Sequence, residues 1–162
     1  MMGVNLGQML QLVIRPALAH IDLGGVAAEQ IMTLIFIQES NSGYYLHQLG
    51  NGPAIGPDEI ETATHDDILA NTLPRYPDLA GKVASLIVEG LPRADQMAGN
   101  FYYATAMARL VLWRRPEPLP AAGDLAGQAA YYKAHYNTAG GAATVPQVIA
   151  NWNAAKASSL WV

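Results

Sequence analysis

The sequence has 162 residues, a formal net charge of −4, and 51% hydrophobic but only 14% charged residues. This composition is typical of one well-packed domain and excludes a disordered chain. Basic residues do not cluster beyond Arg114-Arg115, and there is no cysteine. A nucleic-acid-binding surface, disulfides, thiolate metal sites and a cysteine nucleophile are therefore not expected.

Apolar residues recur at helical spacing along most of the chain, which predicts an all-α or mainly α fold. Residues 5–19 form an amphipathic helix that is interrupted or bent near Pro16, because proline lacks the N–H that a helix interior needs. Residues 26–40 form a second helix, and the near-continuous hydrophobicity of its second half is typical of a helix at the centre of a core. Between them, residues 22–25 predict a turn.

The second half of the chain predicts further helices, separated by Gly and Pro. Thr64 is the expected N-cap of the first of them. Residues 41–61 are rich in Gly, Asn and Ser and predict an ordered loop with a small β excursion. The expected helices span residues 64–73, 78–89, 94–113, 125–136 and 145–157, with a proline-rich connector at 116–120. We expect a single domain over residues 1–162, with no apolar run of the ~20 residues that span a bilayer.

Glu39 follows the apolar run and lies in the last turn of its predicted helix. Burial and the negative end of the helix dipole both disfavour a charged carboxylate at this place and raise its pKa. A carboxylic acid that stays protonated near neutral pH can act as a general acid and protonate a glycosidic oxygen. By position alone, Glu39 also fits an ordinary residue at an exposed helix end.

Three segments far apart in the sequence give Glu39 a context. They are residues 38–40 (Gln-Glu-Ser), residues 52–64, and residues 135–137 (His-Tyr-Asn), followed by a Gly pair at 140–141. Together they resemble the superfamily of lysozyme-like lytic transglycosylases and goose-type lysozymes. There, a Glu-Ser pair ends the core helix, a motif A-x-G-L-x-Q-I-x-P-x-T follows, and a Tyr-Asn pair comes late. The resemblance extends over residues 6–152 and is strongest to small lysozyme-like proteins of tailed bacteriophages.

The resemblance implies a lysozyme-like fold and assigns roles residue by residue. Glu39 matches the catalytic glutamate. Tyr136 and Asn137 match the family's late Tyr-Asn pair, whose tyrosine lies near that acid. The residues at matching positions that are expected to bind the substrate are Ser40, Gly56, Ile60, Tyr136 and Asn137.

The middle motif departs from the family pattern. Pro57 and Asp58 replace the usual apolar residues, Thr62 replaces a proline, and Glu59 stands where a glutamine normally lines the sugar site. We predict that Glu59 contacts the substrate as a second acid or base, or raises the pKa of Glu39 through like-charge repulsion. The alternative is that Asp58, Glu59 and Glu61 form a solvated acidic loop.

The function implied by the resemblance is cleavage of peptidoglycan by a lytic transglycosylase or muramidase of a tailed bacteriophage. The expected partner is a peptidoglycan glycan strand, with other virion or tail proteins as candidate partners and neither nucleic acid nor membrane. The protein would be made in the host cytoplasm without a signal peptide, be carried in the virion, and open the periplasmic cell wall during DNA entry. Two alternatives stay open: a structural tail protein with reduced or no activity, and a free endolysin.

No metal or cofactor is expected. The histidines lack a ligand spacing such as His-Glu-x-x-His, and the family chemistry needs only a carboxylic acid. These histidines are His20, His47, His65 and His135.

Overall fold

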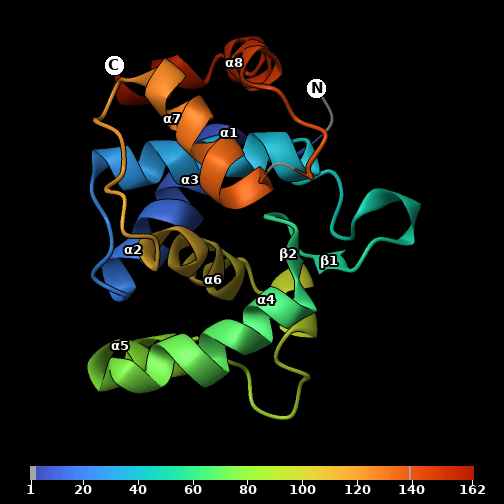
Figure 1. Cartoon of the computed structure of the whole chain (residues 1–162), viewed down its shortest axis with the longest axis vertical. Coiled ribbons are helices and arrows are strands. Elements are labelled where there is room, and N and C mark those ends of the chain that lie inside the picture. The colour runs from blue at the N-terminus through green and yellow to red at the C-terminus, as the bar shows by residue number, and fades with distance from the viewer. Residues whose placement is uncertain (1–2, 139) are drawn as a thin grey trace.

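The computed structural model describes residues 3–138 and 140–162, and most of them are helical (Figure 1). The helices and strands in chain order are α1 (Leu6–Met9), α2 (Arg15–His20), α3 (Val26–Ser40), β1 (Ala54–Ile55), β2 (Ile60–Glu61), α4 (Thr62–Asp67), α5 (Pro77–Ala84), α6 (Phe101–Trp113), α7 (Leu125–Tyr132) and α8 (Val145–Ala154). Short π-helical segments follow α1, α4 and α7 at Leu10–Ile14, Ile68–Thr72 and Lys133–Asn137. Four 3₁₀ segments are described, at Leu49–Asn51, Leu73–Arg75, Asp95–Ala98 and Ala157–Trp161. The predicted mainly α fold with a small β excursion is confirmed.

Helix α3 lies at the centre of the fold, between α7 and α8 on one side and α6 on the other (Figure 1). Every residue from Ala28 to Ile37 is buried. Full burial of one large aliphatic side chain contributes about 1.5–3 kcal/mol, so this helix supplies a large share of the hydrophobic stabilisation. The predicted bounds, residues 26–40, are those observed, because a helix with a nearly continuous apolar run is stable only inside a core.

The N-terminal helix is disturbed near Pro16 in a specific way. It runs from Leu6 to His20 and widens into a π-helical segment just before the proline. Pro16 has no N–H to donate to the carbonyl of Leu12, four residues earlier. The Tyr102 hydroxyl of α6 donates to that carbonyl instead, at 2.9 Å. Pro16 thus widens the helix locally without ending it, and Tyr102 of α6 bonds the Leu12 carbonyl that the proline cannot reach.

Two predicted helix starts are wrong. Helix α4 begins at Thr62 with Glu61 as its N-cap, so Thr64 lies inside the helix, because β2 leads into α4 without an intervening loop. The helix predicted over residues 94–113 is split before α6. The Asn100 side chain accepts a hydrogen bond from the Tyr103 N–H at 3.1 Å and caps a new helix there.

Two predicted helix ends are also wrong. Helix α5 begins at Pro77 and ends at Ala84, five residues before the predicted end. The Gln96 side chain bonds the backbone N–H and carbonyl of Val88 at 2.8 and 3.0 Å, which stabilises an irregular loop in place of another helical turn. Helix α8 ends at Ala154, and a 3₁₀ segment follows it.

A buried hydrogen-bonded chain joins α4 to α6. His65 and Tyr103 are both fully buried, and the His65 Nε2 atom lies 2.7 Å from the Tyr103 hydroxyl. The His65 Nδ1 atom lies 2.8 Å from the Asp66 carboxylate, which can only accept, so Nδ1 donates there. In the neutral ring, Nε2 then accepts the proton of Tyr103.

Tyr103→Phe is expected to lower the free energy of unfolding by about 1–3 kcal/mol, because it leaves a buried ring nitrogen of His65 without a partner. The matched control is Tyr102→Phe in the same helix, whose hydroxyl is bonded in a more exposed place. Water can replace that bond, so a loss below about 1 kcal/mol is expected. Urea unfolding of both variants measures the difference, and equal losses would contradict the assignment.

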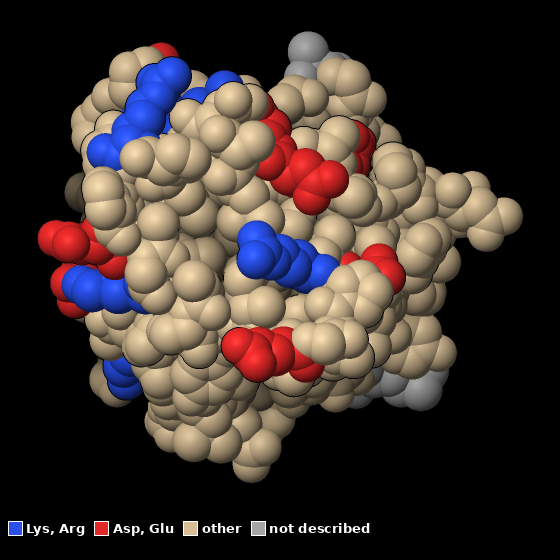
Figure 2. All heavy atoms as spheres, turned by 90° about the horizontal axis from the view of Figure 1, so that it is seen from below, with Lys and Arg blue, Asp and Glu red and all other residues tan. Residues whose placement is uncertain are grey.

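The surface carries few charges. On the face seen in Figure 2, Lys and Arg side chains are interspersed with Asp and Glu side chains and separated by broad uncharged areas. Within the described part of the chain, no helix combines the length and the apolar character required to cross a bilayer.

Candidate active site

The C-terminal end of α3 brings Glu39 to the site. The side chain is partly exposed, and its Oε1 atom accepts a hydrogen bond from the Tyr132 hydroxyl of α7 at 2.5 Å. The helix stops at Asn41, which adopts a left-handed conformation with φ of 52°. Glu39 thus lies in the last turn of the helix. The unpaired carbonyl groups there carry partial negative charge, which disfavours ionisation of the Glu39 carboxyl.

Ser40 holds the helix end in place. Its hydroxyl is buried, donates to the Phe36 carbonyl at 3.0 Å and accepts from the Gly43 N–H at 2.8 Å. Both hydrogen-bonding directions of the hydroxyl are therefore used within the protein. Ser40 therefore holds the end of the helix that carries its neighbour Glu39, and its buried hydroxyl is bonded within the protein.

Two tyrosines, one helical turn apart, connect the site to the C-terminal half of the chain. Tyr132 ends α7, and Tyr136 lies in the π-helical segment that continues it. Their rings are stacked with centroids 6.1 Å apart. The Tyr136 hydroxyl donates to the backbone carbonyl of Asp58 at 2.7 Å, so the tyrosine bonded to Glu39 is Tyr132.

The turn of the β1–β2 hairpin brings two more carboxyl groups. Gly56 begins the turn with φ of 85°, and a Cβ atom there would lie 2.5 Å from the Met97 carbonyl oxygen. The close approach made by this glycine is therefore to the protein's own backbone. Asp58 in the turn is 2% exposed, whereas Glu59 is partly exposed and has a positive φ of 47°.

The carboxyl groups of this cluster hold their protons unusually well. Burial raises the pKa of Glu39 to about 7, the hydrogen bond from Tyr132 opposes this rise, and the charge of Glu59 adds to it. Burial and the charge of Glu39 likewise raise the pKa of Asp58 to about 7. Burial also raises the pKa of Glu59, while His47 counteracts it. The arrangement therefore provides carboxylic acids that remain partly protonated at neutral pH.

The tyrosines stay protonated in this environment. Burial and then the neighbouring carboxylates raise the pKa of Tyr132 well above its ordinary value, and the same causes act on Tyr136. Both hydroxyls thus serve as hydrogen-bond donors throughout the physiological pH range.

A polar cavity of about 300 Å³ adjoins this cluster, between β2, α4, the end of α6 and the segment after α7. Glu59, Ile60, Tyr136 and Asn137 line it, whereas Glu39, Ser40 and Gly56 lie outside its lining. Glu59 therefore connects the two parts, because its charge acts on Glu39 and its side chain borders the cavity.

The remaining predicted residues are partly engaged within the protein. Ile60 is 3% exposed and packs in the core, and the Asn137 side-chain oxygen accepts a hydrogen bond from Lys133 Nζ at 2.8 Å.

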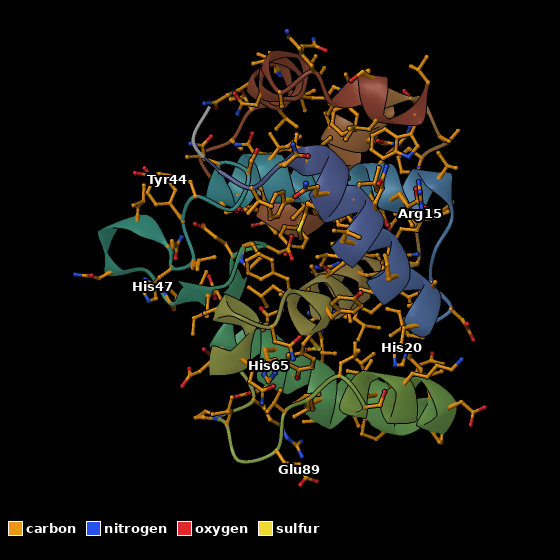
Figure 3. All side chains as sticks on the ribbon, turned by 180° about the vertical axis from the view of Figure 1, so that it is seen from behind. Arg15, His20, Tyr44, His47, His65 and Glu89 are labelled. Carbon is orange, nitrogen blue, oxygen red and sulfur yellow. The ribbon has the colours of Figure 1, made fainter. Side chains whose placement is uncertain are left out.

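Figure 3 shows Tyr44 and His47 on the loop that leads from α3 to the hairpin. Among the residues that the structure describes, no three His, Asp or Glu side chains are grouped as metal ligands would be.

Sequence reasoning named Tyr132 only among tyrosines that could stack on sugar rings, and it missed both the contact of Tyr132 with Glu39 and the burial of Asp58. The signal for Tyr132 was its spacing, because residues 132 and 136 share one helix face. For Asp58 there was no local signal, since an acidic turn residue is usually solvated.

Comparison of the chain with protein families, curated proteins and solved structures found no match in any of the three.

Proposed function

We propose that the chain cleaves the glycan strands of peptidoglycan and that Glu39 is the general acid. One observation carries the proposal: a partly exposed glutamic acid at the end of a buried helix, bonded to Tyr132, with its pKa raised to about 7. Such a group is protonated often enough at neutral pH to donate to the oxygen between two sugars. The setting in a tailed-phage virion, acting at the periplasmic cell wall, is supported by the sequence resemblance.

In the proposed mechanism Glu39 gives its proton to the glycosidic oxygen as the bond to the sugar breaks, through a transition state with positive charge on the ring. The resulting Glu39 carboxylate then takes a proton from the nucleophile. In a transglycosylase the nucleophile is the C6 hydroxyl of the same sugar, and a 1,6-anhydro ring forms. In a muramidase it is water, and Glu59, which borders the cavity, would orient that water.

The second candidate is a structural virion protein that keeps the fold and docks to other virion components. A specific observation favours it: Ser40 and Gly56, which match the family motif, are both engaged in internal contacts, and Glu39 does not line the adjoining cavity. The two candidates differ in whether purified protein releases sugar fragments from cell walls.

The deciding experiment is digestion of purified peptidoglycan by the full chain, with the products identified by mass spectrometry. Muropeptides with either a 1,6-anhydro or a reducing end are expected, and their ratio distinguishes the two reactions. Glu39→Gln should release neither. The matched control is Glu89→Gln, an exposed residue on the loop after α5, at the lower edge of Figure 3, and it should cleave normally. Absence of products from the natural chain would refute the proposed activity and favour the docking role.

A further inference from the structure

Arg114 and Arg115, which follow the end of α6, border two cavities. One is the polar cavity beside the candidate active site. The other has a volume of about 500 Å³, lies between the chain after α4 and the end of α6, and is lined by both arginines together with Arg75. We call it the arginine cavity. The other described residues that line it are uncharged, and the aromatic ones among them are Tyr76 and Trp113.

Three of the nine basic residues of the chain meet in the arginine cavity, although the net charge of the chain is −4. Arg114 has a counter-ion, because it donates a hydrogen bond to the Asp67 carboxylate. Among the described residues, neither Arg75 nor Arg115 forms an ion pair. The arginine cavity therefore contains two cationic groups that the described part of the protein does not neutralise.

Arg115 shows the missing counter-ion most clearly. Its Nε atom is buried and has no hydrogen-bond partner in the part of the chain that the structure describes. The hydrogen bond from its Nη2 atom to the His135 carbonyl is long, at 3.4 Å. A guanidinium shares one charge over a planar fork of N–H donors that matches the oxygens of a carboxylate or a phosphate. An anion in the arginine cavity would compensate the charge of Arg115.

Tyr76 and Trp113 give the arginine cavity an apolar wall. Their rings meet edge to face with centroids 4.8 Å apart, and Tyr76 is 46% exposed. Such rings pack against the aliphatic parts of a ligand, while the charged residues fix its polar groups. A ligand that fits this cavity therefore combines acidic groups with an aliphatic part and is larger than a single inorganic anion.

We propose that the arginine cavity binds the carboxylates of a short acidic peptide, namely the peptide stem that peptidoglycan carries on its glycan strand. Such a stem contains D-glutamate and diaminopimelate, so its carboxylates are separated by aliphatic chain. Arg75 and Arg115 come from different segments, and each can bind a separate carboxylate. Because Arg114 and Arg115 border both cavities, a glycan strand at the polar cavity would have its stem within reach of the arginine cavity.

The inference rests on the proposed function only in naming peptidoglycan as the source of the peptide, since binding of the free peptide requires no cleavage. A purely structural role for the arginines makes a different prediction. Cations stabilise the negative end of a helix, and Arg114 and Arg115 follow the end of α6. Arg75 lies outside that helix, because it ends the 3₁₀ segment Leu73–Arg75, and its side chain is exposed. Replacement of Arg75 therefore tests binding with little effect on folding.

NMR titration of the full chain with the peptide L-Ala-γ-D-Glu-diaminopimelate tests the proposal. The chain has three tryptophans, and their indole N–H signals report on different places. Trp113 lines the arginine cavity, whereas Trp152 and Trp161 stack on each other near the C-terminus. The peptide should move the Trp113 signal and leave the other two where they are. An unmoved Trp113 signal, or equal movement of all three, would overturn the proposal.

Arg75→Gln should weaken peptide binding about tenfold, because one charge-assisted contact is lost. The matched control is Arg93→Gln, the same change at an exposed arginine on the loop between α5 and α6, and it should bind the peptide normally. Equal affinities of Arg75→Gln and the natural chain would contradict the assignment.

Two further ligands identify the chemistry that the arginine cavity binds. The same peptide with its carboxylates amidated should bind at least about tenfold more weakly, because it has no charge to offer the arginines. Inorganic phosphate should also bind more weakly than the peptide, since it cannot contact the aromatic wall. If phosphate binds as tightly as the peptide, the cavity is a general anion site and the peptide assignment is wrong.

Digestion of peptidoglycan separates this inference from the proposed function. If the natural chain binds the peptide but releases no sugar fragments, the proposed activity fails and the peptide site stands. If the chain cleaves peptidoglycan but the peptide does not bind, the activity stands and the peptide site is refuted.

Discussion

Glu39→Gln is expected to make the protein more stable above pH 7 while it lowers the cleavage rate by about 10²- to 10⁴-fold, the usual contribution of a general acid. The buried position raises the pKa of Glu39 from 4.5 to about 7. Between those pH values the folded chain binds a proton that the unfolded chain has released, so stability falls as the pH rises. Above pH 7 the full cost applies, on the order of 3 kcal/mol. Glutamine removes it and still accepts the bond from Tyr132.

Thermal unfolding at pH 8 and at pH 4 measures the effect. The variant should melt at a higher temperature than the natural chain at pH 8, and the two should melt together at pH 4, where Glu39 is protonated in both states. Glu89→Gln, the exposed control, should show no such pH-dependent difference. Equal melting temperatures of Glu39→Gln and the natural chain at pH 8 would mean that the Glu39 carboxylate is not destabilised by its surroundings.

Gly56→Ala is expected to lower the free energy of unfolding by about 2–4 kcal/mol. Two causes add. The positive φ of 85° disfavours any side chain, and the new Cβ atom would lie 2.5 Å from the Met97 carbonyl oxygen, which belongs to backbone and cannot turn aside. Relief of this contact requires the turn to move away from Met97, and Asp58 and Glu59 move with it. Cleavage should fall together with stability, as measured by urea unfolding and peptidoglycan digestion.

Gly50→Ala is the matched control for this change. Gly50 also has a positive φ, of 74°, but a Cβ atom there would meet nothing within 4 Å. Only the conformational cost of about 1 kcal/mol is expected. Similar losses in the two variants would show that the packing of the hairpin turn against Met97 contributes nothing of its own.

The helix predicted best from the sequence is the one that is most deeply buried. Helix α3 was placed within its observed bounds because its second half is almost continuously apolar and is buried. Helix ends were harder, since single hydrogen bonds determine them. The cap formed by Asn100 divides a continuous helical pattern, and the bonds from Gln96 to Val88 hold a loop where the helix was predicted to continue to residue 89.

The candidate site divides in the same way. The raised pKa of Glu39 was predictable because the residue ends a buried helix, and local sequence describes that helix well. The contacts of Tyr132 and Asp58 join segments that are far apart in the sequence. Tyr132 bonds Glu39, 93 residues away, and the Asp58 carbonyl accepts from Tyr136, 78 residues away. No local pattern encodes such a meeting, and the family motif drew attention to Tyr136 in place of Tyr132.

The stacked tyrosines also determine how the two halves of the site are spaced. One hydroxyl holds the end of α3 and the other holds the hairpin backbone, and both come from a single rigid stretch of helix. The two hydrogen bonds together fix the distance between Glu39 and the hairpin turn. If the hairpin moves relative to α3, one of the two bonds must break, so a change in one half of the site also alters the other half.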